Sequence, residues 1–350
     1  MHMKKYDVIA IGELNVDLIL NSIDGLPEIG KEKFAGNMIM TLGSSTAIFS
    51  ANVSSLGSRV AFVGMIGKDS FGELVKSSLR AKGVDTSLLI ETDQDATGAT
   101  IVLNYDEDRA NVTYQGTMDL MSFEDIDRSI FENTKHIHIS SVFLQSGIKK
   151  DLQEILSYAR EKGVTTSLDP QWDPLEEWDF DYAKLLPFVS VFMPNEKELQ
   201  FITGTTNLDD AIAKIRPYIN TCIVKRGNKG SLMLRSDGTS NNLEAFLNKD
   251  VVDAIGAGDS FNAGFINQFV QGKLPEECQR FGNLTGAVNT TASGGTGAFS
   301  SKENVIRIGK EKFNLEISLL PSGRNSSNIN RKKRRFLPPT FTTSKHCNLL

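Results

Sequence analysis

Short apolar runs that alternate with helix-like stretches are the feature that most constrains the fold of this chain. The first run, Tyr6–Gly12 (YDVIAIG), is almost wholly apolar and ends in glycine, which is typical of a strand buried on both faces of a parallel sheet. Helix-like stretches such as 151–162 separate the later runs. This alternation predicts an α/β fold with a doubly wound, mainly parallel sheet flanked by helices. The later runs are 60–64, 136–140, 164–168, 189–193 and 222–224.

Two segments interrupt this alternation, at about 18–40 and 98–115. In both, β-branched and aromatic residues alternate with polar ones, and no long helical pattern intervenes. We expect a small antiparallel sheet beside the main body. Because such a sheet can leave one face in water, we interpret it as a lid over a site at the carboxyl ends of the parallel strands. Its open strand edges predict a homodimer.

Composition excludes several classes of protein. The 350 residues are 40% hydrophobic and 23% charged, with a formal net charge of −5, which suits a globular core and not a surface built to neutralise nucleic-acid phosphates. There is no run of about 18 apolar residues and no signal-peptide pattern. The three cysteines fit neither a metal clip nor a disulfide framework. These features predict a cytoplasmic protein that binds neither nucleic acid nor membrane.

The charge distribution separates a folded domain, expected at 4–310, from a basic tail at 321–350. The tail has seven basic residues, no acidic residue and few apolar ones. Such a composition cannot repay the entropy of ordering, so we expect disorder. A dispensable or artificially added extension is our interpretation, and binding to an acidic partner is the alternative.

The segment 251–265 contains the pattern with the clearest chemistry. Gly256 and Gly258 flank an alanine where a helix-like pattern begins, so the backbone can turn tightly and point free N–H groups at an anion. Asp259 follows in the first helical turn, where a carboxylate beside an anion site suggests proton transfer. An ordinary glycine loop with a capping Asp is the alternative. Other glycine motifs do not fit: no phosphate-loop motif is present, and Phe261 stands where a dinucleotide fingerprint requires glycine.

The sequence resembles the ribokinase-like (PfkB) carbohydrate kinases, whose C-terminal signature is similar to Asp253–Asp259 followed by Ser-Phe. The resemblance covers about residues 4–310, because further family landmarks occur in order. It implies the ribokinase-like fold, and transfer of a phosphoryl group from ATP to a sugar hydroxyl with Mg²⁺ as cofactor. The landmarks are Gly12–Asp17, Gly43–Gly57, Val63–Gly72, Asp169-Pro170, Asn195–Glu198 and Gly227–Gly230.

The resemblance implies catalytic roles for four consecutive residues. Asp259 matches the base that takes a proton from a primary hydroxyl. The N–H groups of Gly256, Ala257 and Gly258 match those that stabilise the transferring phosphoryl group.

The resemblance also implies residues that bind the cofactors. Asn195 and Glu198, three residues apart, match a motif that organises Mg²⁺ through its waters near the nucleotide phosphates, with an N-capped surface helix as the alternative. Asp253 and the loop 293–298 match the place where many members hold a monovalent cation, which suggests K⁺. The nucleotide itself is expected at Lys225, Gly227, Gly230 and Asn283.

Asn15 and Asp17 are the expected acceptor-binding residues. They lie two apart, so in an extended segment both face one side and can bind vicinal sugar hydroxyls, and they match substrate positions of the family. Gly43 falls on the next sugar-binding motif. There the family usually has Gly-Gly and a nearby Asn, whereas this chain has Ser44 and Ile48, so the identity of the sugar stays open.

Other polar and aromatic residues allow more than one interpretation. Gln171, Trp172 and Asp173 replace the Asn and Arg found in members that act on larger or acidic sugars, and no carboxylate clamp remains. Arg109 could meet an anionic substrate or simply be solvated. Trp172 and Trp178 could stack on a sugar or anchor the fold. His136 and His138 share one strand face but lack a third ligand, so we interpret them as hydrogen-bonding residues of the structure.

The sequence therefore predicts an ATP-dependent kinase for ribose, fructose or a related small sugar. A nucleoside kinase is the nearest alternative, because the same site would accept a ribose that carries a base. The changed Ser44 and Ile48 positions leave a second alternative, a catalytically silent sugar or nucleoside sensor.

Overall fold

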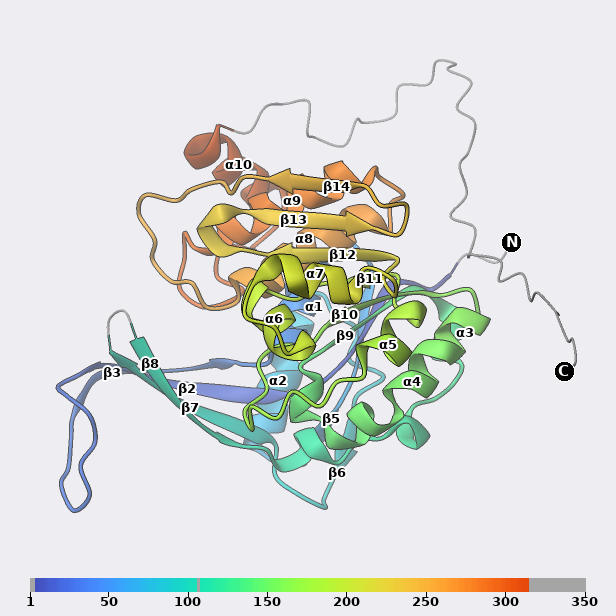
Figure 1. Ribbon diagram of the computed structural model, residues 1–350. Helices are drawn as coiled ribbons and strands as arrows, with labels where there is room; N and C mark the ends of the chain where they lie inside the picture. Colours follow the sequence, from blue (N-terminus) through green and yellow to red (C-terminus); the bar gives the residue numbers. More distant parts are fainter. Residues whose placement is uncertain (1–3, 106–107, 315–350) are drawn as a thin grey trace, which may run out of the picture. The chain divides into compact units, whose positions relative to one another are not determined.

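A central sheet dominates the computed structural model, which describes residues 4–105 and 108–314 (Figure 1). Within these residues its eight strands follow the spatial order β14 (Ser240–Leu243), β13 (Ser231–Arg235), β12 (Thr221–Lys225), β11 (Val191–Phe192), β10 (Thr165–Asp169), β9 (Thr134–Ser140), β1 (Tyr6–Ile11) and β4 (Val60–Val63). The strands from β12 to β4 pair in parallel, and β13 and β14 pair antiparallel at one edge. Each apolar run overlaps one of these strands, so the predicted α/β sheet is confirmed. The predicted tail at 321–350 lies outside the described residues.

Helices bury both faces of this sheet, which explains why strands such as β1 and β4 are largely apolar. Ile9 and Ile11 of β1 belong to one buried cluster, with α4 (Ser146–Glu161), α6 (Glu196–Thr203) and α7 (Leu208–Ile215). Val8 and Ala10 belong to the other, with α1 (Ser45–Ser55), α2 (Ser70–Ala81), α8 (Ala257–Phe269) and α9 (Pro275–Asn289). The run that predicted a doubly buried strand therefore packs as expected.

Four further strands form the predicted small sheet, here called the lid, which extends beyond the helices in Figure 1. Their order is β3 (Ala35–Leu42), β2 (Asn15–Ile23), β7 (Gly98–Tyr105) and β8 (Asp108–Tyr114). The outer pairs are antiparallel as expected, but β2 and β7 in the middle pair in parallel. The reason is that each of these two strands begins a hairpin at the same place, with Asn15 opposite Gly98.

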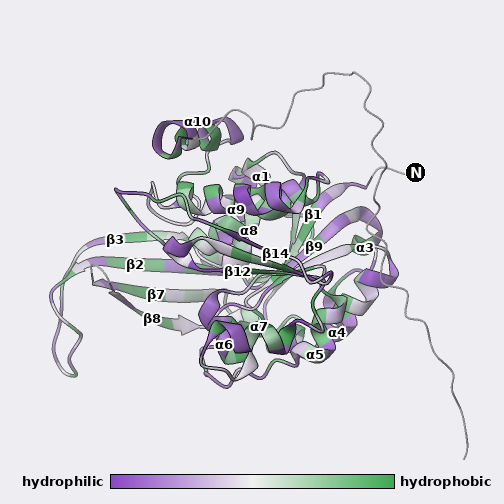
Figure 2. Cartoon of the chain, turned by 45° about the horizontal axis from the view of Figure 1, so that its top comes forward, coloured by the Kyte–Doolittle hydropathy of each residue, from purple (hydrophilic) through white to green (hydrophobic). Residues whose placement is uncertain are grey.

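The strand register gives the lid two different faces. Asp17, Thr100 and Thr113 stand opposite one another and line the cavity described below. The next residue on each strand points to the other face. That row is apolar and consists of Met40, Leu18, Ile101 and Val112. Met40, Ile101 and Val112 are 50%, 44% and 63% exposed, and Figure 2 shows hydrophobic segments along these strands.

Short elements connect these layers. A two-stranded parallel sheet joins the body to the lid, and the remaining helices are single turns apart from the last. These elements are β5 (Met65–Gly67), β6 (Ile90–Thr92), α3 (Ile130–Asn133), α5 (Tyr182–Leu185), α10 (Lys302–Phe313), and the 3-10 turns η1 (Gly116–Asp119), η2 (Phe123–Asp125), η3 (Val142–Leu144), η4 (Leu186–Phe188) and η5 (Gly227–Lys229).

Candidate active site

A cavity of about 790 Å³ lies between the carboxyl ends of the central strands and the polar face of the lid. Twelve predicted site residues line it: Asn15, Asp17, Asn195, Glu198, Lys225, Gly227, Gly230, Gly256, Ala257, Gly258, Asp259 and Asn283. Gly43 and Asp253 lie outside the lining. Residues from distant parts of the chain thus meet around one cavity.

The glycine loop presents backbone donors to this cavity. α8 begins at Ala257, and Gly256 is its N-cap in the left-handed region (φ 73°). A Cβ at position 256 would lie 2.6 Å from the Cα of Gly295, so glycine is required twice over. The N–H of Ala257 donates to the Ala254 carbonyl (3.2 Å). Among the described residues, the N–H groups of Gly256 and Gly258 have no partner, and they stand at the positive end of the α8 dipole.

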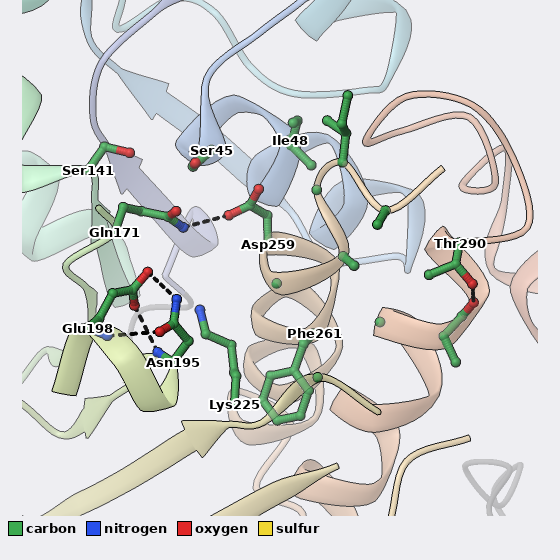
Figure 3. Close-up of a pocket in the computed structure, with 18 of the residues that line it drawn as sticks. Ser45, Ile48, Ser141, Gln171, Asn195, Glu198, Lys225, Asp259, Phe261 and Thr290 are labelled. Atoms are coloured by element: carbon green, nitrogen blue, oxygen red, sulfur yellow. Dashed lines mark hydrogen bonds between the residues drawn. The ribbon is translucent and has the colours of Figure 1, made fainter. Parts of the chain in front are cut away.

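Asp259 is a buried carboxyl group, 7% exposed, that borders the cavity from the first turn of α8. Its Oδ1 accepts a hydrogen bond from Nε2 of Gln171 at 2.9 Å (Figure 3). Burial, followed by the negative charge of Asp169, raises the pKa of Asp259 to about 8, although Lys225 acts in the opposite direction. Near neutral pH this carboxyl group can therefore either hold or release a proton.

Lys225, at the end of β12, is held by a carboxylate that the sequence predictions did not assign. Its Nζ donates to Oδ2 of Asp169 at 2.5 Å, and Asp169 is fully buried. The same Oδ2 accepts from Asn262 (2.5 Å) and Gln171 (3.0 Å). The position of Asp169 at the carboxyl end of β10 was the signal that could have identified it, because neighbouring parallel strands end at the same edge.

Asn195 and Glu198 form a reciprocal cap at the start of α6. The Asn195 side chain accepts from the N–H of Glu198 (2.9 Å), and Glu198 accepts from the Asn195 N–H (2.8 Å) and side chain (2.6 Å). Both residues line the cavity, and Glu198 is buried. Burial and the Asp169 charge raise the pKa of Glu198 to about 7. The N-capped helix that was the alternative interpretation of these two residues is therefore present, but its capping residues line the cavity.

The residues expected to bind the nucleotide also line the cavity. Gly227 (φ 55°) and Gly230 (φ 84°) bracket a 3-10 turn, and a Cβ at Gly230 would lie 2.0 Å from the Leu243 carbonyl. The Asn283 side chain donates to the carbonyls of Leu243 (3.2 Å) and Glu244 (2.9 Å). Asn283 thus ties α9 to the end of β14.

Asn15 and Asp17 project together into the cavity from β2, as their spacing predicted. Asn15 Nδ2 donates to Asp17 Oδ1 (2.9 Å) and to Thr100 Oγ1 (3.0 Å). Burial raises the pKa of Asp17 to about 6, while Asn15 and the positive charge of Arg109 lower it. Arg109 lines the cavity, so it lies on the polar face of the lid.

Gly43 and Ser44 shape the same end from behind. A Cβ at Gly43 would lie 2.4 Å from Asp17 Oδ1, so this glycine leaves room for the Asp17 carboxylate. Ser44 has φ 66°, which favours glycine, but its hydroxyl caps α1 by accepting from the Ala47 N–H (2.9 Å) and donates to the Glu13 carbonyl (2.7 Å). At position 44 this chain thus has a serine that caps α1, where the family usually has glycine.

The second departure, Ile48, also has a structural role. A Cβ added at Gly256 would lie 3.1 Å from the Ile48 side chain, and one added at Gly295 would lie 2.5 Å from it. Ile48 therefore packs against the loop that carries the free N–H groups. Nearby Glu13, which the sequence predictions did not assign, lines the cavity and accepts from Thr46 Oγ1 (2.7 Å), and burial raises its pKa to about 7.

The tryptophans pack away from the cavity. Trp172 and Trp178 contact each other edge to face at 5.0 Å, both contact Phe201, and neither lines the cavity. Asp173 is buried and accepts from the N–H groups of Leu175 (3.0 Å) and Trp178 (2.7 Å). These residues stabilise the loop that follows β10.

The histidine pair makes the structural hydrogen bonds that its pattern suggested. His136 bonds to Thr165 (2.8 Å) and Ser167 (2.7 Å), and His138 bonds to Ser167 (2.7 Å) and stacks on Phe49. Burial lowers the pKa of both rings.

A sequence profile described as "pfkB family carbohydrate kinase" matches residues 5–302. This chain belongs to the pfkB family of carbohydrate kinases. The kinase is 28% identical to "Probable fructokinase-2" of Arabidopsis thaliana, covering 82% of this chain and 91% of that protein. It is 25% identical to the ribokinase of Haemophilus influenzae, covering 85% and 96%.

The fold of the kinase matches solved structures as well. Arabidopsis thaliana ribokinase, complexed with ribose and ATP, superposes with a TM-score of 0.74 at 24% identity, covering 87% of this chain and 98% of that one. Within the residues that the structure describes, no helix is long and apolar enough to cross a membrane.

The clustered carboxyl groups predict how stability depends on pH. Glu13, Glu198 and Asp259 have pKa values of about 7, 7 and 8, above those of an unfolded chain, so the folded state binds their protons more tightly. The stability they contribute is complete below about pH 4 and is lost as the pH rises through these values. Buried His136 and His138 act in the opposite direction, but only below about pH 7, because above it they are neutral in both states.

We therefore predict that the ligand-free kinase becomes less stable between pH 7 and 8, by up to about 1.4 kcal/mol per proton per pH unit. Thermal unfolding at constant ionic strength measures this, and Asp259→Asn, which removes the group with the highest of these pKa values, should flatten the dependence. A melting temperature that is constant or rises over this interval would contradict the prediction.

Proposed function

We propose that this kinase transfers the γ-phosphoryl group of ATP to a hydroxyl of a small sugar, with Asp259 as the base. The observation that carries the proposal is the juxtaposition of Asp259 with the N–H groups of Gly256 and Gly258, which have no partner in the described part of the chain, in a cavity that Asn15 and Asp17 also line. A proton acceptor, an anion site and hydroxyl-binding groups are the parts that such a transfer requires. The ribose and ATP bound to the Arabidopsis ribokinase belong to that protein, and they support this choice of substrates.

The proposed step moves one proton and one phosphoryl group. Asp259 takes the proton of the acceptor hydroxyl, the freed oxygen bonds to the γ-phosphorus, and the bond from that phosphorus to the bridging oxygen breaks, releasing ADP. The N–H groups of Gly256 and Gly258, with the ammonium group of Lys225, stabilise the charge on the phosphoryl oxygens. The N–H of Ala257 donates to the Ala254 carbonyl, so we assign it no contact with the phosphoryl group.

Mg²⁺ would be held chiefly by the nucleotide phosphates and water. The described residues contain no group of three His, Cys, Asp or Glu side chains that could bind a metal. Glu198 fits an indirect role, since its carboxylate is fixed by Asn195 at the edge of the cavity and oxygen donors suit Mg²⁺. When bound, the ion would neutralise charge on the phosphates.

At the acceptor end we propose that Asn15 and Asp17 bind sugar hydroxyls and that Gly43 makes room for them. Gly227, Gly230 and the segment tied down by Asn283 would bind the nucleotide. This division places the lid over the acceptor and residues 4–310 in one catalytic domain.

The first prediction from this proposal concerns the base. We expect coupled ADP release with Mg·ATP to occur with one member of a panel of D-ribose, D-fructose, other hexoses and nucleosides. Asp259→Asn should keep ATP binding and lose about 10²- to 10⁴-fold in kcat, because an amide cannot accept the proton. A near-normal kcat in this variant would refute the assignment, and turnover with nucleosides alone would identify a nucleoside kinase.

The second prediction concerns the monovalent cation. The carboxylate of Asp253 accepts from the N–H groups of Ile255 and Gly294, and the carbonyl oxygens of Gly295 and Thr296 accept from side chains of the protein. These oxygens therefore already have hydrogen-bond donors, and the proposed transfer does not depend on a cation. The family resemblance still predicts faster turnover in KCl than in NaCl at equal ionic strength, and equal rates would remove the prediction.

The third prediction concerns assembly. We propose that two copies pair through the apolar lid face made by Met40, Leu18, Ile101 and Val112, because such a face is stabilised by burial. Light scattering after size exclusion should give twice the 38.5 kDa chain mass. Ile101→Glu with Val112→Glu should give the monomer, whereas Leu274→Glu, at an exposed leucine outside the lid, should not. A wild-type monomer would contradict the proposal.

A further inference from the structure

Gln171 occupies an unusual position beside the proposed base. It follows β10 and Pro170, lines the cavity, and has φ 60°, in the left-handed region that side chains other than Gly, Asn and Asp rarely adopt. Glu176 and Trp178 in the same loop share this backbone region. A long, unbranched side chain gains nothing locally from this conformation, so its contacts must compensate.

Those contacts are with two carboxylates. Nε2 of Gln171 donates to Oδ1 of Asp259 at 2.9 Å and to Oδ2 of Asp169 at 3.0 Å, so both hydrogens of one amide group are used. Among the described residues, Gln171 is the side chain that donates a hydrogen bond to Asp259. Lys225 and Asn262 donate to Asp169 instead.

The geometry points to Gln171 as a positioning residue of the phosphoryl transfer, one that holds Oδ1 of Asp259 and leaves the second carboxylate oxygen free for the acceptor hydroxyl. In Figure 3 this second oxygen is turned away from Gln171. The inference rests on the proposed role of Asp259 as base. It gives Gln171 a role in catalysis, whereas the family resemblance showed only that this residue departs from other members.

The same hydrogen bond acts on the protonation of Asp259. The charged groups that bear on this carboxyl group are Asp169, Glu13 and Glu198, which favour its protonated form, and Lys225, which favours its ionised form. An N–H donor favours the ionised form, which is the one that can accept a proton. Gln171 therefore both orients the base and keeps it available at a lower pH than burial alone would allow.

The experiment compares Gln171→Met, which keeps the length and removes the donor, with Gln171→Asn. Asparagine suits the left-handed backbone but is one methylene shorter, so it tests the contact if the Met variant fails to fold. Glu176→Met is the matched control, because Glu176 has φ 56° in the same loop and is exposed. The probe is D-ribose or D-fructose, whichever supports turnover, with kcat and kcat/KM measured from pH 5 to 9.

Both Gln171 variants should lose about 10- to 100-fold in kcat, as is typical when a supporting residue is removed, with the KM for ATP unchanged. The acidic limb of kcat/KM should move upward by about one pH unit, because rates rise as Asp259 loses its proton. Glu176→Met should behave as wild type. A pH limb that does not move, or equal losses in the Glu176 control, would overturn the inference.

Two further readouts keep this inference separate from the proposed function. If Asp259→Asn is fully active, the base assignment fails; if it is inactive while Gln171→Met is normal, only the positioning role fails. Should neither sugar be phosphorylated, ¹³C NMR of the aspartate carboxyl carbons reads the hydrogen bond directly. Asp259 should then titrate at higher pH in Gln171→Asn than in wild type, and an unchanged titration would overturn the inference.

Discussion

The buried contact between Lys225 and Asp169 is the interaction on which the site depends. It joins β12 to β10 across β11. Asp169 also accepts hydrogen bonds from Asn262 of α8 and from Gln171 of the loop after β10. Removing one partner of such a pair typically destabilises a protein by about 3–5 kcal/mol, since a buried charge is left alone. The pair therefore fixes the spacing of the strand ends and the helix that line the cavity.

Around this pair the site is rich in carboxyl groups, and their protonation is its dominant electrostatic property. Burial raises the pKa values of Glu13, Asp17, Glu198 and Asp259 into the range of about 6 to 8. Each group is held by amide, hydroxyl or backbone donors. A folded chain tolerates this cost where function needs a base that works near neutral pH.

The lid shows how one register serves two purposes. Because side chains alternate along a strand, β2, β7 and β8 each supply residues both to the cavity and to the apolar outer face. A shift of one residue in the pairing would exchange the two faces. Closing the site and offering an apolar face are thus properties of a single arrangement.

The sequence alone determined the elements and the chemistry that sits at their ends. Apolar runs such as 6–12 and 60–64 predicted a doubly covered sheet, because a strand of mainly apolar residues is unstable with one face in water. The Gly-Ala-Gly-Asp pattern favoured an N–H cluster at a helix start beside a carboxylate. The parallel pairing of β2 with β7 was not predictable from local alternation, which is the same for parallel and antiparallel strands.

Only the tertiary structure decided which groups meet. Asp169 and Gln171 stand about 90 residues before Asp259, and nothing in their local sequence states that one amide bridges both carboxylates. The serine at position 44 and the isoleucine at 48 were departures from a motif until the helix cap and the packing against Gly256 and Gly295 gave them roles. Local patterns follow from the chemistry of the backbone, whereas contacts between distant segments depend on how the sheet orders its strands.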